Sequence, residues 1–140
     1  MKINFHYDIV KFRLRESNAV KKIMARIISD AGMRAGSIEV IFTSDKKLYE
    51  INNEFLGHDY YTDIITFNYN TGKTINGEIY ISADRVKKNA GTYKSVMKEE
   101  IRRVIFHGVL HLCGYDDRTK EQKRKMSEME ELYLALSYAE

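Results

Sequence analysis

The chain has 140 residues and a mass of 16.4 kDa, which is the size of one domain. Hydrophobic residues make up 44% of it and charged residues 31%, a balance that excludes an intrinsically disordered chain. Its 23 basic and 20 acidic residues give a net charge of +3, which is compatible with an anionic partner, and its single cysteine excludes an internal disulfide. No apolar run is long enough to span a membrane, and the first residues lack the apolar core of a secretory signal. We therefore expect one cytoplasmic domain over residues 1–140, without a membrane partner.

The first half of the chain alternates strand and helix patterns. Residues 3–7 and 37–43 have the apolar pattern of strands. Between them, Ser17 is a candidate cap for a helix that ends near Gly32. Ser44 is a candidate cap for a second helix, which runs to about Phe55.

The second half begins with strand patterns over residues 63–69 and 77–82, which we expect to pair as a hairpin with residues 70–76 as its loop. Helix patterns follow over residues 82–92 and from about 96 to 113, where Gly114 is a typical helix end. Thr119 and Gln122 have the spacing of a capping box that opens a last helix. Because strands and helices do not alternate strictly, we expect an α+β fold with a small mixed sheet of about four strands and about five helices.

The segment from His107 to Asp117 contains the ligand pattern of a metal site. His107 and His111 are four residues apart on a predicted helix, so both imidazoles leave the same face. Gly114 lets the chain turn back, which brings the Asp117 carboxylate toward the two histidines. Two histidines, one aspartate and a water would complete a tetrahedral Zn²⁺ site, as on the metal-binding helix of zincin proteases.

The same segment leaves several alternatives. The protease motif has a glutamate base after the first histidine, where this chain has Gly108, so the ligands are present and the protease base is absent. Asp116 competes with Asp117 as the third ligand; spacing favours Asp117 and leaves Asp116 a supporting or turn role. Cys113 is expected in the core. The two histidines could also share a helix face by chance, or satisfy hydrogen bonds in the core.

At this point the residues from His107 to Asp117 resemble the YbeY family of zinc-dependent endoribonucleases. The family signature H-G-x-L-H-L-x-G-Y-D-H is matched at every specified position but the last, where Asp117 replaces histidine. Residues 52–67 and 77–82 are similar to two further family stretches. The resemblance implies one zinc ion per chain, hydrolysis of single-stranded RNA, and a role in maturing the 3′ end of small-subunit ribosomal RNA and in ribosome quality control. The small ribosomal subunit is the partner that it implies.

One departure concerns catalysis directly. The family has an arginine at the position of Leu56, which cannot bind phosphate or stabilise developing charge. His58, two residues later, is a partial substitute or a solvated loop residue. Zn²⁺ can polarise a phosphoryl oxygen and activate water, so no side-chain nucleophile is required, and either zinc-bound water or a 2′-hydroxyl could attack.

Two basic stretches are candidate RNA faces. Residues 11–34 carry a local charge of about +5 and residues 82–103 of about +4, counted from their side chains. Lys98, Arg102 and Arg103 are the candidate RNA-binding residues nearest the metal motif. Tyr60, Tyr61 and Tyr69 could stack on bases or pack at the core. A charge run is also typical of a solvated helix face.

Two other functions remain as alternatives. The first is a zinc protease of unusual type, against which Gly108 argues. The second is a ribosome-associated binding module that uses zinc only for stability, which Leu56 in place of arginine keeps open.

Overall fold

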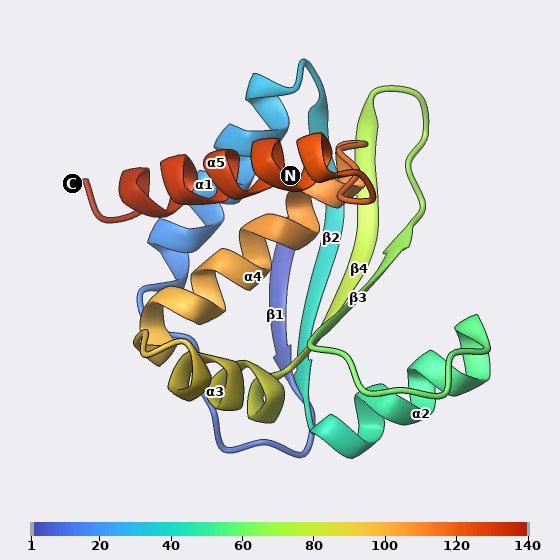
Figure 1. The fold of residues 1–140 in the computed structure, drawn as a ribbon. Helices are drawn as coiled ribbons and strands as arrows, with labels where there is room; N and C mark the ends of the chain where they lie inside the picture. The colour runs from blue at the N-terminus through green and yellow to red at the C-terminus, as the bar shows by residue number, and fades with distance from the viewer. Residues whose placement is uncertain (1, 140) are drawn as a thin grey trace.

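A four-stranded mixed sheet lies at the centre of the computed structural model, which describes residues 2–139 (Figure 1). Its strands are β1 (Lys2–Tyr7), β2 (Arg34–Thr43), β3 (Ile64–Asn68) and β4 (Thr74–Ser82), in the order β1-β2-β4-β3. β1, β2 and β4 are parallel, and β3 is antiparallel to β4. The predicted hairpin is therefore confirmed, but its loop is shorter than predicted, because β4 already begins at Thr74.

Five helices complete the described part of the chain, which forms a single domain. They are α1 (Ser17–Asp30), α2 (Asp45–Leu56), α3 (Ala83–Thr92), α4 (Met97–Leu112) and α5 (Lys120–Leu136). The α+β fold with a small mixed sheet is thus confirmed. Among the described residues, no helix combines the length and the apolar character that a membrane crossing requires.

The main core lies between one face of the sheet and the helices α1, α4 and α5, which gather on that side in Figure 1. Val40 and Phe42 of β2 and Ile79 of β4 are fully buried there, as are Ile105 and Phe106 of α4. On the opposite face, α2 packs Leu48 and Ile51 against Ile65 of β3 in a smaller cluster. The segment that joins α2 to β3 consequently lies beside the edge strand, where α4 also makes contact with β3.

The helix boundaries follow local capping chemistry, with one exception. Ser44, Ser82 and Thr119 each accept a backbone hydrogen bond at the start of a helix, and Thr119 and Gln122 form the full capping box. The predicted cap at Ser17 is wrong, because Ser17 is the first helical residue and Glu16 occupies the cap position with a left-handed backbone. The Glu16 carboxylate pairs with Arg102 and Lys98 instead of capping the helix.

Candidate metal centre

The C-terminal half of α4 carries two histidines on one face. The neighbouring residues Phe106, Val109 and Leu110 are buried in the core, which fixes the rotation of the helix about its axis. His107 and His111 therefore leave the same side, with their Nε2 atoms 3.0 Å apart. Two unprotonated nitrogens at this distance repel each other unless a proton or a cation lies between them.

The turn after α4 brings a carboxylate to the same place. Gly114 has a φ of 99°, a left-handed conformation that glycine adopts without a steric penalty. The chain turns back there, and Tyr115 N–H donates to the Leu110 carbonyl. Asp117 Oδ2 then lies 3.3 Å from His111 Nε2 and 3.4 Å from His107 Nε2.

These three atoms have the spacing of a metal coordination face. Ligand atoms at about 2.0–2.1 Å from a tetrahedral zinc ion are about 3.3 Å from one another. The triangle of His107 Nε2, His111 Nε2 and Asp117 Oδ2 has sides of 3.0, 3.3 and 3.4 Å. The residues present could therefore hold a metal ion, with the side of the triangle that faces the pocket left for a fourth ligand.

A carboxylate on α5 orients the first histidine, and the sequence did not reveal it. His107 Nδ1 lies 2.5 Å from Glu130 Oε2. If the Nδ1–H donates to this carboxylate, the Nε2 lone pair is directed toward Asp117 and His111. Glu130 is 23 positions away in the sequence, so no local spacing connects it to the motif.

The electrostatic surroundings of His107 are dominated by opposing effects. Burial would lower its pKa, but the hydrogen bond and charge of Glu130, together with Asp117 and Asp63, raise it above the ordinary value. Burial raises the pKa of Asp63, which lines the pocket beside His107. The carboxylates around His107 thus favour a positive charge at its imidazole, and the same negative charges would favour a bound cation.

A pocket of about 480 Å³ opens beside the three candidate ligands. Its wall is formed by the end of α2, the segment leading to β3, and β3 itself. Leu56 lies in this wall, so the position where the resemblance expects an arginine faces the site. His58 and Tyr60 lie there too, with their rings stacked 5.1 Å apart and Tyr60 Oη 2.9 Å from His58 Nδ1.

Gly108 lies at the close contact between α4 and the sheet, and it has no side chain that could act as a protease base. A Cβ atom there would lie 2.9 Å from Ile64 Cδ1 and 3.1 Å from Ile79 Cγ2, so α4 packs closely on the sheet at Gly108 and a larger residue would require these side chains to shift. Position 108 faces the core and not the pocket. A glutamate at this position could not act on a substrate bound at the metal site, which argues against the protease alternative.

The remaining residues of the motif are placed elsewhere. Asp116 is exposed and lines a different cavity with Gln122 and Lys125, while Glu130 occupies the supporting position that we had considered for Asp116. Cys113 is buried, as expected, and burial raises the pKa of its thiol to about 11.

The candidate RNA-binding residues of α4 have three different environments. Arg102 is a correction to the prediction, since its side chain is only 1% exposed and donates to Ser137 and Glu16. Arg103 pairs with Glu100 and Glu131 and lines a cavity next to His107. Lys98 is exposed and lies 3.5 Å from Glu16, at the other end of the helix from the histidines.

The candidate stacking tyrosines also differ. Tyr60 lines the pocket. Tyr61 contacts the ring of Tyr49, and the Arg85 guanidinium lies over the Tyr61 ring. Tyr69 donates a hydrogen bond to Glu78. Tyr60 is therefore the tyrosine of the three that lies in the wall beside the candidate ligands.

The α+β fold, with two histidines on one helix and an aspartate after the turn that follows it, is typical of a metal-dependent enzyme. The chain matches the family model "Endoribonuclease YbeY" over residues 3–137. It is 39% identical over 136 residues to a protein of that name from Parabacteroides distasonis, covering 97% of this chain and 96% of the relative. It is 40% identical over 134 residues to the one from Flavobacterium psychrophilum, covering 96% and 95%. The chain therefore belongs to the YbeY endoribonuclease family, a family of RNA-hydrolysing enzymes.

A solved structure agrees with this assignment at the level of the fold. The solution structure of a protein from Thermotoga maritima superposes with a TM-score of 0.66 at 25% identity, covering 98% of this chain and 89% of that one. The sheet and helices that position the histidines are thus part of a fold that occurs in a structure determined in solution.

Proposed function

We propose that this protein is a zinc-dependent endoribonuclease that cuts single-stranded RNA in the pocket beside His107, His111 and Asp117. The observation that carries the proposal is the triangle of their ligand atoms, whose sides of 3.0 to 3.4 Å match one face of a zinc tetrahedron. Two imidazoles and one carboxylate are also a donor set that suits zinc. We extend the proposal to maturation of the 3′ end of small-subunit ribosomal RNA and to ribosome quality control in the cytoplasm, with the small subunit as partner.

The residues of the chain have separate tasks in this proposal. His107, His111 and Asp117 would hold the ion, which when bound supplies Lewis acidity toward a phosphoryl oxygen and toward water. Glu130 holds the proton on His107 Nδ1 and leaves Nε2 as the donor atom. Asn52 donates from Nδ2 to the Tyr60 carbonyl at 3.0 Å, which holds the pocket wall in place.

Substrate phosphate needs a cation, and the lining of this pocket contains no lysine or arginine among the described residues. Of the lining residues outside the candidate ligand group, His58 is the one that can carry a positive charge. It lies in the same wall as Leu56. We propose that the His58 side chain takes over the contact that Leu56 cannot make.

The test is cleavage of a labelled single-stranded RNA by the metal-loaded protein, beside a chelated sample and the variants His111→Ala and His6→Ala. His6 is exposed on β1, outside the pocket, so its variant controls for the loss of a histidine as such. Cleavage by the wild type and His6→Ala, with none in the chelated sample or in His111→Ala, is the expected result. Cleavage that persists in His111→Ala would disprove hydrolysis at this site.

The second candidate is a ribosome-associated binding module in which the metal only stabilises the fold. The observation that favours it is Leu56 in the pocket wall, where an arginine would bind phosphate. Zinc bound one to one, no cleavage in any sample, and unfolding of His111→Ala by circular dichroism would together select this function.

A further inference from the structure

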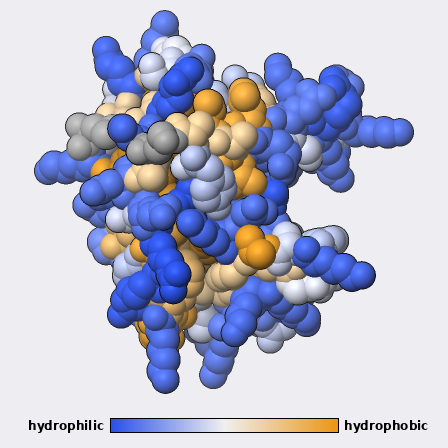
Figure 2. All heavy atoms as spheres, turned by 90° about the vertical axis from the view of Figure 1, so that its left-hand side faces the viewer, coloured by the Kyte–Doolittle hydropathy of each residue, from blue (hydrophilic) through white to orange (hydrophobic). Residues whose placement is uncertain are grey.

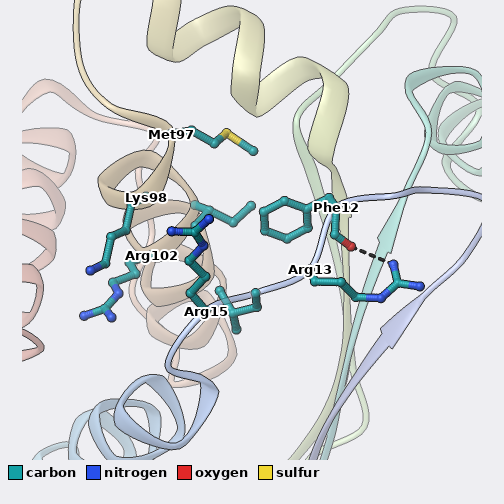
Figure 3. Close-up of a pocket in the computed structure, with 8 residues that line it drawn as sticks. Phe12, Arg13, Arg15, Met97, Lys98 and Arg102 are labelled. Atoms are coloured by element: carbon teal, nitrogen blue, oxygen red, sulfur yellow. Dashed lines mark hydrogen bonds between the residues drawn. The ribbon is translucent and has the colours of Figure 1, made fainter.

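A second cavity lies at the N-terminal end of α4, opposite the end that carries the metal centre. It has a volume of about 350 Å³, within the range of ligand-binding pockets, and it is enclosed by residues 12–15 and the first two turns of α4 (Figure 3). Phe12, Leu14, Met97 and Ile101 give it an apolar lining. It shares no lining residue with the pocket of the metal centre, so it goes beyond the function proposed above.

Another cavity of about 520 Å³ adjoins this one, since Phe12 and Met97 line both. We call the two together the loop groove. Its lining residues outside the first cavity are Ile9, Val10, Lys11, Ala83, Asp84 and Lys87. Figure 2, which views the side that lies to the left in Figure 1, shows hydrophobic residues exposed between hydrophilic ones on that face.

The charge of the loop groove is strongly positive. Its lining contains six cationic side chains and one carboxylate: Lys11, Arg13, Arg15, Lys87, Lys98 and Arg102 against Asp84. The carboxylate already accepts a hydrogen bond from the Asp45 backbone at the start of α2. The groove therefore attracts anionic groups.

Two of these arginines lack a partner for all or part of the guanidinium group among the described residues. Arg15 extends between Lys98 and Phe12 in Figure 3, and it forms no ion pair within residues 2–139. Arg102 is buried, and its Nε–H has no acceptor within that range, although Glu16 and Ser137 accept from its other nitrogens. Glu16 thus balances part of the charge and leaves the rim positive.

An exposed and strained isoleucine lies at one end of the loop groove. Ile9 is 79% exposed and has a φ of 59°, a left-handed conformation that is costly for a β-branched residue. Its side chain is not buried and its backbone conformation is strained, so Ile9 does not stabilise the fold. An apolar side chain held out at the edge of an apolar groove instead adds to a contact surface.

We propose that the loop groove binds an acidic segment of a partner protein. An apolar side chain of that segment enters the cavity between Leu14 and Ile101, and flanking carboxylates pair with Arg15 and Lys98. Stacking of RNA bases fits less well, because the ring of Phe12 is already packed edge-on against Phe42 at 5.1 Å and against Tyr7. Apolar lining with a basic rim matches an amphipathic acidic peptide.

The test is fluorescence anisotropy with a short labelled peptide of leucine and phenylalanine residues flanked by glutamates. Two further probes are the same peptide with lysines in place of the glutamates, and a single-stranded RNA oligonucleotide. The full chain is used as wild type, Arg15→Glu, Ile9→Asn and Lys123→Glu. Lys123, exposed on α5 outside the groove, is the matched charge-reversal control.

We expect the acidic peptide to bind the wild type and Lys123→Glu alike, and Arg15→Glu about fivefold more weakly. Ile9→Asn is the sharper variant, since asparagine tolerates the left-handed backbone. It should raise the melting temperature and still weaken binding, which separates loss of contact from loss of fold.

Three results would overturn the proposal. The first is no binding of the acidic peptide up to millimolar concentration. The second is equal affinity for all four proteins or for the lysine peptide. The third is RNA binding that falls in Arg15→Glu and Ile9→Asn while peptide binding does not, which would assign the groove to RNA.

Discussion

Gly108 shows how one residue separates this site from that of a zincin protease with the same ligand spacing. The position faces Ile64 and Ile79, where α4 contacts the sheet, and a Cβ atom there would require the ends of these side chains to shift. Close contact there keeps His107 and His111 near β3, which forms the opposite wall of the pocket. The absence of a glutamate at position 108 therefore follows from packing as well as from chemistry.

Glu130 should control how tightly the site holds metal. In Glu130→Gln, the uncharged amide accepts the Nδ1 hydrogen bond of His107 more weakly, so the imidazole is a poorer donor. We expect zinc affinity to fall about tenfold to a hundredfold, measured by competition with a chromophoric chelator. Glu128→Gln, on an exposed position of the same helix, is the control. Equal affinities of the two variants would show that Glu130 does not position the ligand.

At the scale of elements, α5 connects the metal centre to the far side of the core. Its C-terminal half carries both Glu130 and, three residues later, Tyr133, whose hydroxyl donates to Asp30 at the end of α1 over 2.8 Å. Tyr133 is buried, and burial together with the Asp30 hydrogen bond raises its pKa to about 12. The interaction thus links two helices that both pack on α4.

This link predicts a stability difference that depends on pH. Tyr133→Phe should lower the free energy of unfolding by about 1–2 kcal/mol near neutral pH, because Asp30 loses a buried donor. Tyrosine has its ordinary pKa of about 10 in the unfolded chain, so its contribution is complete below pH 10. The contribution is lost as the pH rises from about 10 to about 12, the pKa in the folded protein.

The measurement is urea denaturation of both proteins at several pH values, since every other titrating group is common to them. The difference between wild type and Tyr133→Phe should be constant from pH 6 to about pH 9 and should shrink above pH 10. A difference that stays constant through pH 12 would mean that the hydroxyl is not held by Asp30.

For the whole molecule, local patterns predicted more of the fold than of the site. Capping residues and apolar periodicity located the five helices, and the i, i+4 spacing placed both histidines on one face. Contacts between distant segments were invisible to such patterns. Glu130 reaches His107 across 23 positions, and Arg102 is buried because Glu16 and Ser137 come from opposite ends of the chain. Both interpretations of Arg102, as an RNA-binding residue or as part of a solvated helix face, require an exposed side chain, and both are wrong because the tertiary structure buries it against these partners.

The same long-range connections predict how metal binding should affect the entire fold. The candidate ligands join α4 to the turn before α5, and Glu130 joins the centre to α5 itself. A ligand that binds only the folded state at a hundred times its Kd stabilises it by about 2.7 kcal/mol. For a chain of this length that corresponds to a rise in Tm of about 9 °C.

Thermal unfolding with and without zinc checks this prediction in the wild type, His111→Ala and His6→Ala. We expect the rise in the wild type and in His6→Ala, and little or none in His111→Ala, because two remaining ligands bind zinc weakly. An equal rise in His111→Ala would place the bound metal elsewhere on the protein. No rise in the wild type at saturating zinc would mean that the three side chains gather without forming a metal site, and the proposed chemistry would then lose its basis.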